Sequence, residues 1–396
     1  LTVTANMTIG AEVAINTANP PAQFTINLAQ PSHGTISLSP ATADGKYYKE
    51  TKVTATITFE PCYQFNGWTG DLSGTQTSKI FTVTSGITIG ADVTGNNTPS
   101  VVRTVSSVTE FKNALNAMNP GDIIEVADGS YNMGSVKINR SGCEQRPILI
   151  VAKNQGQAII NGNTTWELDG LKYVTIKGFS FKSASVGTGI KVLNCSRVRI
   201  TGNHFNLTET SSCNWVYIGD TFGSTLPLKS GHNKVDFNVF DGKTQPGKFI
   251  LLDGNINQQS QHDTISYNLF KNNGPRAANE KESIRIGVST LSKSSGFTVV
   301  EYNLFQDCDG DPEIVSVKSC DNIIRFNTFQ RCLGTLCLRQ GFRSVAEGNH
   351  FFGEGKTALY TVANSDGSTS TSTIGCGGVR VYGLDHKVIN NYFHGL

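Results

Sequence analysis

The chain has 396 residues, which is too long for one ordinary globular core, so we expect two domains or a repeat architecture. Only 16 % of the residues are charged and the formal net charge is +2, which excludes a polycationic protein that binds nucleic acid through its overall charge. No apolar run is long enough for a membrane span, and no signal peptide is recognisable in this chain.

The first 95 residues contain a repeat at domain-sized spacing. Leu1–Val13 recurs as Phe81–Val93 with eight of thirteen residues identical, so we expect the chain to begin within the last strand of a preceding module. Alternating runs such as Lys52–Phe59 predict a small β-sandwich-like domain over residues 1–95. Residues 96–100 have the composition of a linker.

Several phrases of this domain match a known repeat. Gly34-Thr35-Ile36, Tyr48 and the run Phe65–Asp71 resemble the divergent repeats of bacterial surface proteins. The resemblance implies a spacer or a weak glycan-binding module, and we favour the spacer. It also implies a bacterial-type protein that is secreted, periplasmic or displayed on the cell surface.

One short helix is predicted after the linker. Ser107 and Glu110 stand at the spacing of a capping box, and the apolar residues Phe111, Leu115 and Met118 follow at helical spacing. Because only strand-like phrases come afterwards, we expect this helix to cap the end of an elongated β structure.

From about residue 170 the chain repeats the phrase Asn-x-Phe. The seven copies begin at Asn203, Asn238, Asn268, Asn303, Asn327, Asn349 and Asn391. We expect each Asn to bond the backbone of a turn and each Phe to point inward and stack on the Phe of the next coil. The fold class predicted for residues 101–396 is therefore all-β, a right-handed parallel β-helix.

Two further features of this region lead to expectations. Cys308 and Cys332 occupy equivalent places in successive repeats, and with nine cysteines in all and no CxxC pair we favour buried thiols over a disulfide framework or a zinc site. The chain stops on the phrase Asn391–Phe393, so we expect either that the solenoid is truncated here or that another element covers its last coil.

Three consecutive coils carry charged residues inside strand-like phrases. These phrases are Asn279–Gly287, Asp309–Ser319 and Gly334–Gly341. Lys318 and Arg339 are 21 residues apart, about one coil, so we expect the two cations to lie near each other on one face. The alternative is an ordinary ladder of solvated ion pairs on the outside of the solenoid. That alternative would be favoured for each residue taken alone, but charged residues on three successive coils favour a site.

Oxygen ligands are expected beside these cations. Alternation places Asp311 and Glu313 on a common side, and Asn279 enters from the preceding coil. An amide oxygen and two carboxylates from neighbouring coils form a hard-oxygen set suited to Ca²⁺.

The same three coils resemble a family, the family 6 polysaccharide lyases, which contain alginate lyases and the dermatan-cleaving chondroitinase B. The matching phrases are Glu282–Gly287, Asp311–Ser319 and Gly334–Gly341, with further matches in Phe111–Tyr131 and Gly378–His386. The resemblance covers roughly residues 101–396. It implies cleavage of a uronate polymer by β-elimination to 4,5-unsaturated products.

Roles for individual residues follow from that resemblance. Lys318 falls on the family's base and Arg339 on its acid, and the residues Asn279, Asp311 and Glu313 fall on its calcium ligands. The chemistry is consistent, because a cation on the uronate carboxylate stabilises the intermediate that forms when the C5 proton is removed. We give Arg339 an electrostatic role before a literal acid role, because a guanidinium holds its proton tightly.

Three positions depart from the family pattern. Asp311 is shorter than the usual Glu, Lys281 stands where Gly is common, and Gln340 replaces a His. Lys281 is expected either to pair with Asp311 or Glu313 and partly to substitute for the metal, or to be an ordinary solvated lysine on a loop. These departures weaken the prediction of calcium more than that of lyase activity. The residues predicted to bind substrate are Arg285, Lys281, Gln340, Arg343, Arg380 and His386.

Alginate is the favoured substrate, because sulfated polymers usually need more basic residues than this chain offers. Chondroitin or dermatan sulfate is the alternative within the lyases. A non-catalytic glycan-binding β-helix protein and a hydrolase on the same solenoid are the other classes, and the hydrolase is disfavoured because the acids accompany a lysine and an arginine. Endo or exo action, mannuronate or guluronate preference and oligomeric state stay open.

Overall fold

The computed structural model describes residues 21–184, 187–363 and 365–396. The chain forms two compact units, Leu1–Thr98 and Pro99–Leu396, and each unit has its own hydrophobic core. Among the described residues no helix is long and apolar enough to cross a membrane. The predicted repeat strand Leu1–Val13 lies outside the described residues.

The first unit is a small two-sheet β domain. Its larger sheet has the order β3-β1-β7-β5 and comprises β1 (Gln23–Ala29), β3 (Lys46–Tyr48), β5 (Tyr63–Gly70) and β7 (Ile87–Gly95). Its smaller sheet has the order β2-β4-β6 and comprises β2 (Gly34–Ser39), β4 (Lys52–Phe59) and β6 (Ser78–Thr82). Alternate residues of both sheets, such as Ile57 and Ile89, meet in one core, which agrees with the predicted sandwich.

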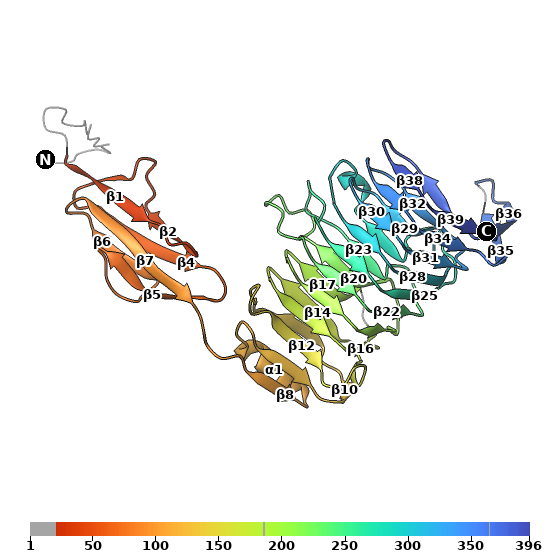
Figure 1. Cartoon of the computed structure of the whole chain (residues 1–396), viewed down its shortest axis with the longest axis horizontal. Helices are drawn as coiled ribbons and strands as arrows, with labels where there is room; N and C mark the ends of the chain where they lie inside the picture. The colour runs from red at the N-terminus through yellow and green to blue at the C-terminus, as the bar shows by residue number, and fades with distance from the viewer. Residues whose placement is uncertain (1–20, 185–186, 364) are drawn as a thin grey trace, which may run out of the picture. The chain divides into compact units, whose positions relative to one another are not determined.

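The second unit is a parallel β-helix, as predicted, built from three long parallel sheets (Figure 1). The eleven-stranded sheet contains β8 (Val102–Val105), β9 (Ile123–Val126), β12 (Ile148–Ala152), β15 (Val174–Lys177), β18 (Arg199–Thr201), β21 (Lys234–Asp236), β24 (Thr264–Ser266), β27 (Val299–Glu301), β30 (Ile323–Arg325), β33 (Val345–Glu347) and β38 (Lys387–Ile389). The ten-stranded sheet contains β10 (Gly129–Tyr131), β13 (Ala158–Ile160), β16 (Ser180–Phe181), β19 (His204–Phe205), β22 (Val239–Asp241), β25 (Leu269–Asn273), β28 (Leu304–Cys308), β31 (Thr328–Gln330), β34 (His350–Phe352) and β39 (Tyr392–His394).

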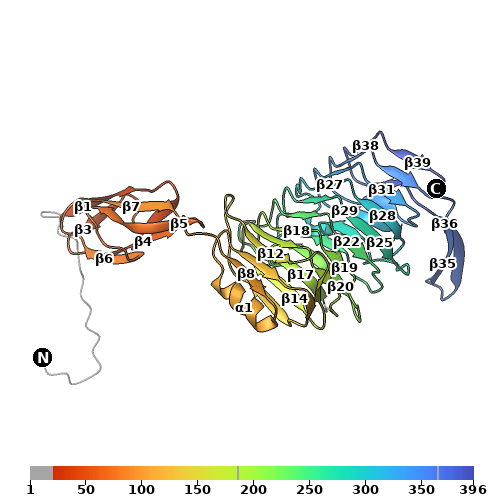
Figure 2. The ribbon, with the colours of Figure 1, turned by 60° about the horizontal axis from the view of Figure 1, so that its bottom comes forward.

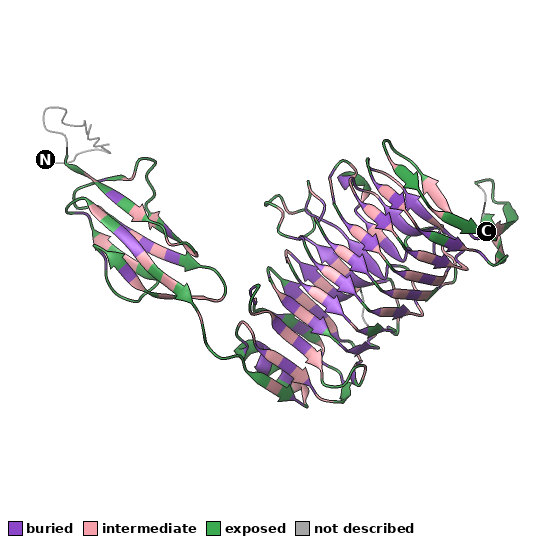
Figure 3. Ribbon diagram, viewed as in Figure 1, coloured by how far each residue is buried: buried purple, intermediate pink, exposed green. Residues whose placement is uncertain are grey.

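The nine-stranded sheet is the one that carries the candidate site. It contains β11 (Ser135–Ile138), β14 (Thr165–Asp169), β17 (Gly187–Leu193), β20 (Cys213–Gly219), β23 (Ile250–Leu252), β26 (Ile284–Ile286), β29 (Glu313–Val317), β32 (Thr335–Leu338) and β37 (Val379–Val381). A short 3-10 helix, Ser289–Leu291, follows β26, and a hairpin of β35 (Thr357–Ala363) and β36 (Thr369–Gly375) precedes β37. Along many of the strands, buried and more exposed residues alternate (Figure 3), whereas β29 is buried at every position.

The Asn-x-Phe repeats produce two ladders, as predicted. From Asn238 to Asn391, each Asn side chain accepts a hydrogen bond from the backbone N–H of the Asn one coil earlier, for example Asn303 N to Asn327 Oδ1 at 3.0 Å. The amide also donates to a carbonyl of that earlier coil. Inside, eight Phe rings from Phe181 to Phe393 stack in sequence, with centroids 4.6–5.0 Å apart. The ladders therefore fix the register between coils.

The predicted helix caps one end of this core. It is α1 (Val108–Ala117), and the Oγ of its N-cap Ser107 accepts from Glu110 N. Glu110 reaches back to Ser106 N at 2.8 Å, one residue earlier than a standard capping box. Phe111 and Leu115 are buried against the first coils, so the helix covers apolar surface that would otherwise face water (Figure 2).

The predicted stacked thiols are also present. Cys308 and Cys332 are buried and free, and the backbone N–H of Cys308 points at Cys332 Sγ at 3.4 Å. Burial, with the neighbouring Cys308 sulfur, raises the pKa of the Cys332 thiol well above its usual value. The pair therefore packs as small apolar groups.

A buried carboxyl in one turn should make stability depend on pH. Asp263 is buried, accepts from Asn233 N at 2.8 Å and from Ser260 Oγ at 2.5 Å, and burial raises its pKa to about 6. A raised pKa means that the folded state holds the proton more tightly, so stability falls as pH rises from about 4 to 6. We expect Asp263→Asn to unfold at higher urea than the wild type at pH 8, by up to roughly 3 kcal/mol, with little difference at pH 4. A variant less stable than the wild type at pH 8 would contradict this reading.

Candidate active site

The outward face of the nine-stranded sheet presents one continuous row of side chains. Backbone register aligns Lys137, Glu167, Lys191, Tyr217, Leu251, Arg285, Ser316, Cys337 and Arg380, and we call this set the outer row. On each side of a row residue the strand neighbours, such as Ile284 and Ile286, point into the core. The row residues therefore face outward.

A second row lies at the ends of the same strands. Hydrogen bonds from Gly287 N to Leu252 O, Lys318 N to Ile286 O, Arg339 N to Val317 O and Tyr382 N to Leu338 O continue the sheet ladder by one position. Gly287, Lys318, Arg339 and Tyr382 therefore occupy equivalent places in four successive coils, and we call them the end row. The predicted juxtaposition of Lys318 and Arg339 on adjacent coils is thus present in the structure.

Lys318 and Arg339 differ in how they are held. Within the described part of the chain, the ammonium of Lys318 has no ion pair, and the residue is partly exposed. The Nε of Arg339 lies 3.2 Å from Glu313 Oε1, and its guanidinium stacks over the Tyr382 ring at 5.0 Å. The lysine is therefore free to approach a ligand, while the arginine is oriented by two contacts.

Glu313 and Tyr382 hold a second guanidinium beside the first. Arg380 donates to Glu313 Oε1 at 2.5 Å, and its guanidinium lies 5.3 Å from the Tyr382 ring centre. The other oxygen of Glu313 accepts from Ser316 Oγ at 2.5 Å. Both arginine side chains keep about two fifths of their surface exposed, at 42 % and 37 %. Two oriented guanidiniums therefore remain partly exposed to solvent on the two coils that follow Lys318.

A second ionic group lies one coil earlier. Lys248, almost fully buried, pairs with Glu280 and lies 3.5 Å from Glu282 Oε2. Arg285 also binds Glu280, at 3.1 Å. Burial alone would raise the pKa of Glu280, but the Lys248 hydrogen bond and charge, with Arg285, outweigh it and lower that pKa. The acids of this coil are therefore neutralised by side chains of the chain itself.

The predicted calcium ligands do not form a fitting site in this arrangement. Glu313 already serves two arginines and a serine, and both Asp311 oxygens accept backbone N–H groups, from Glu313 at 2.9 Å and from Lys281 at 3.1 Å. Burial, together with the Glu282 carboxylate, raises the pKa of Asp311 to about 6. Among the described residues no three His, Cys, Asp or Glu side chains cluster as metal ligands, and Asn279 is exposed.

The expected pairing of Lys281 with Asp311 or Glu313 is wrong. Its ammonium turns inward and donates to Thr244 O at 2.6 Å and Pro275 O at 2.9 Å. Burial, with the nearby charge of Lys243, lowers its pKa. Only its backbone N–H reaches Asp311. Lys281 therefore secures the loop between β25 and β26, and its ammonium is not presented to a ligand.

Three other predicted substrate-binding residues, Arg343, His386 and Gln340, follow the end row along the chain, and their contacts differ. Arg343 forms a two-point ion pair with Asp321, at 2.7 Å through each nitrogen. His386 Nδ1 accepts from Ser344 N at 3.1 Å, which gives the ring a structural role in a turn. The backbone of Gln340 bonds Val317 O, and its buried Oε1 has no hydrogen-bond partner among the described residues. Their predicted roles in substrate binding gain no support from these contacts.

Sequence reasoning missed two residues of the site, Lys248 and Tyr382. A signal for Tyr382 was present, because Val315–Lys318, Leu336–Arg339 and Val379–Tyr382 each have apolar residues at their first and third positions, followed by the end-row residue. Aligning these phrases places Tyr382 directly after Arg339 in the end row. Lys248 has no comparable signal, since its partner Glu280 lies on a loop whose path only the fold defines.

Comparisons with known proteins agree with this architecture. A family model described as Chondroitinase B matches residues 105–396, and one described as Divergent InlB B-repeat domain matches residues 24–97. No curated protein sequence gives a significant match. Among solved structures, the PL6 family alginate lyase AlyGC shares 28 % identity at a TM-score of 0.61, over 74 % of this chain and 38 % of that chain.

Two further structures extend the comparison. A mannuronic acid specific family 6 lyase from human gut microbiota shares 25 % identity at a TM-score of 0.62, over 75 % of this chain and 65 % of that one. The PL6 polysaccharide lyase Pedsa3628 from Pseudopedobacter saltans shares 24 % identity at a TM-score of 0.60, over 74 % and 63 %, and shows the fold alone. The chain spans less than two thirds of the length of each of these proteins.

Proposed function

The chain belongs to the chondroitinase B family, and from that premise we propose that it is a polysaccharide lyase that cleaves a uronate polymer, most specifically alginate, by β-elimination. The observation that carries the proposal is the end row, in which Lys318 and Arg339 stand on adjacent coils with Arg380 beside them. A free amine next to two oriented guanidiniums is what elimination from a uronate requires.

The proposed reaction uses these groups in one sequence. Arg339 and Arg380 bind the uronate carboxylate and stabilise the negative charge that grows on it. The amine of Lys318, in its neutral form, takes the C5 proton, and the electron pair left on C5 forms the C4–C5 double bond. The C4–O bond breaks, and the departing oxygen takes up a proton, so one product carries a 4,5-unsaturated sugar. No water is added to the polymer.

Calcium stays a prediction of the family resemblance, and no step of this sequence depends on it. We expect activity to persist in strong chelator, because two guanidiniums already face the place of the substrate carboxylate and Glu313 is engaged by them. Initial rates with and without chelator check this, with calcium titration calorimetry as an independent readout. Abolished activity that added calcium restores, with stoichiometric binding, would show that Glu313 exchanges its arginines for the metal.

Alginate is preferred over sulfated polymers for two reasons. The cations Arg285, Arg339 and Arg380 are each paired with an acid, which leaves little excess charge for sulfate groups. Two solved relatives with identities of 25 % or more are described as an alginate lyase and a mannuronic acid specific lyase. Dermatan or chondroitin sulfate remains the alternative, because the matching family model is described by chondroitinase B.

Absorbance of unsaturated products near the ultraviolet edge tests the proposal. The wild type is assayed on polymannuronate, polyguluronate, dermatan sulfate and chondroitin sulfate. We expect the largest signal on a non-sulfated uronate polymer. A folded protein that yields no unsaturated product from any of them would refute lyase activity and leave a glycan-binding β-helix protein.

We also infer that the protein works outside the cytoplasm. The match of residues 24–97 to a divergent InlB B-repeat domain, a module of bacterial surface proteins, supports this inference. A polymeric substrate that is too large to enter a cell intact fits the same location.

A further inference from the structure

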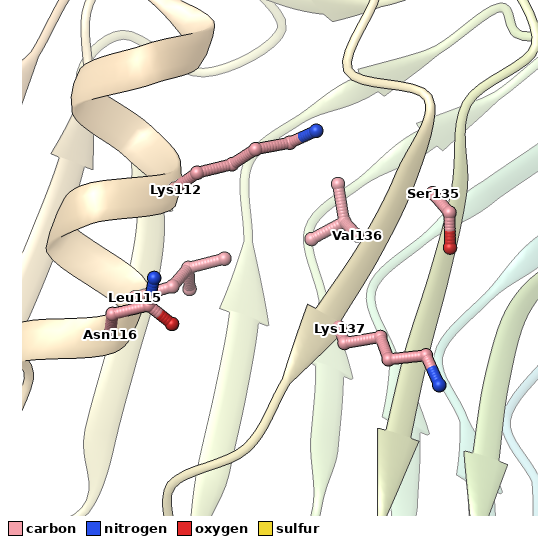
Figure 4. A pocket seen from close by; sticks show the side chains of 6 residues that line it. All are labelled: Lys112, Leu115, Asn116, Ser135, Val136 and Lys137. Carbon is pink, nitrogen blue, oxygen red and sulfur yellow. The ribbon is translucent and has the colours of Figure 1, made fainter.

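A second cationic region lies at the opposite end of the nine-stranded sheet from Arg380. A cavity of about 290 Å³ opens between α1 and β11, and Lys112 and Asn116 line it from the helix while Ser135 and Lys137 line it from the strand. Figure 4 shows Lys112 extending from the helix towards β11. This cavity lies outside the proposed catalytic groups.

A neighbouring cavity continues the first along the same face. Its volume is also about 290 Å³, and Ser135 lines both cavities. The second cavity adds the polar side chains of Thr165, Glu167, Thr188 and Lys191. The two cavities are therefore adjacent hollows across β11, β14 and β17.

The charge of this region is predominantly positive. Within the described residues Lys112 and Lys191 form no ion pair, and Lys137, with 75 % of its side chain exposed, has a single partner, Glu167, at 3.5 Å. Arg140 adds a fourth cation, since its guanidinium reaches Asn116 O at 3.4 Å. A negative ligand would thus meet uncompensated ammonium groups, together with hydroxyl groups able to bond sugar hydroxyls.

Backbone register connects this region with the proposed active site. Lys137, Glu167 and Lys191 are the first residues of the outer row, and Arg285 and Arg380 stand near its other end. From β11 to β29, the strand that Lys318 directly follows, there are six strand steps, and at about 4.8 Å each they span roughly 29 Å. An extended polymer that lies along the row would reach both regions at once.

We propose that the two cavities form a distal subsite that binds uronate units of the same polymer chain whose cleavage is assigned to the end row. This proposal rests on the proposed function, because it takes the substrate to be a polyanion lying along the sheet. The distal lysines bind sugar carboxylates without taking part in the chemistry. They act on the affinity for long chains and leave the bond-breaking step unchanged.

The test compares two double variants on substrates of two lengths. Lys112→Ala with Lys191→Ala removes two cavity-lining cations that form no ion pair among the described residues, and Lys172→Ala with Lys177→Ala removes two exposed lysines on or beside the eleven-stranded sheet as a control. We expect the first pair to raise KM for long polymer by roughly fivefold with kcat unchanged, and to leave KM for short oligosaccharides unchanged. The control pair should alter neither constant.

Two results would overturn the proposal. One is a KM of the Lys112/Lys191 variant for long polymer that equals the KM of the control pair. The other is a rise in the KM of the Lys112/Lys191 variant that is equally large for short and long substrates. Affinity electrophoresis in gels that contain uronate polymer separates this question from catalysis. A wild type that cleaves nothing but is retarded more than the Lys112/Lys191 variant would refute the lyase and keep the subsite, whereas equal migration of both would refute the subsite.

Discussion

Lys318→Ala is expected to lower kcat on a uronate polymer by roughly 10³-fold, within the range that a positioned general base contributes. The reason is that the amine of Lys318 is the one basic group of the end row, and Arg339 beside it is held by Glu313 and Tyr382. KM should change little, because the arginines still bind the carboxylate. Initial rates of unsaturated product formation measure the effect.

The fold should survive this substitution, which makes the result interpretable. No ion pair among the described residues involves Lys318, so its truncation removes no structural partner. Lys293→Ala provides a matched control, since Lys293 is an exposed lysine that follows the preceding strand of the same sheet, β26. Thermal unfolding should be alike for both variants. A Lys318→Ala protein that keeps more than about a tenth of the wild-type kcat would exclude Lys318 as the base.

Asn327→Ala is expected to lower the free energy of unfolding by about 3–5 kcal/mol, the largest stability effect of a single side chain that we anticipate. The Asn327 side chain accepts from Asn303 N and donates to Val300 O and to Asn349 Oδ1. Alanine would leave the buried Asn303 N without this partner and would remove the amide's bond to Val300 O. Urea unfolding at neutral pH, followed by circular dichroism, measures the loss.

The neighbouring position supplies the control for this prediction. Thr328 follows Asn327 on the outward side of β31 and is only partly buried. Thr328→Ala should shift the urea midpoint much less, because it breaks no ladder contact. Equal shifts for the two variants would mean that the asparagine ladder contributes no more than an ordinary strand position, and the account of how register is fixed would then be wrong.

The fold could be predicted from the sequence because its repeat is dense and chemically constrained. Each Asn-x-Phe phrase satisfies a turn with an amide and fills the core with a ring, and both ladders are observed from Asn203 to Asn391. The helix over Val108–Ala117 could be predicted for the same kind of reason, since a cap residue and apolar spacing act within one turn of chain.

Residues of the candidate site could be predicted to lie together only where their separation along the sequence equals the length of one coil. Lys318 and Arg339 satisfy that condition, and the structure places them on adjacent coils. Lys281 could not be placed, because a long side chain on a loop can turn either way and burial against Thr244 O and Pro275 O decided it. The engagement of Glu313 by Arg380 joins residues 67 positions apart, across two coils and a hairpin, which no local pattern indicates.

The most direct test of the central claim is digestion of polymannuronate by the wild type in water enriched in heavy oxygen, followed by mass spectrometry of the oligosaccharides. Elimination breaks the C4–O bond without adding water, so we predict products that carry no heavy oxygen at the new ends and that include one unsaturated sugar. Incorporation of heavy oxygen at each cleavage, with saturated products, would identify a hydrolase and contradict the account.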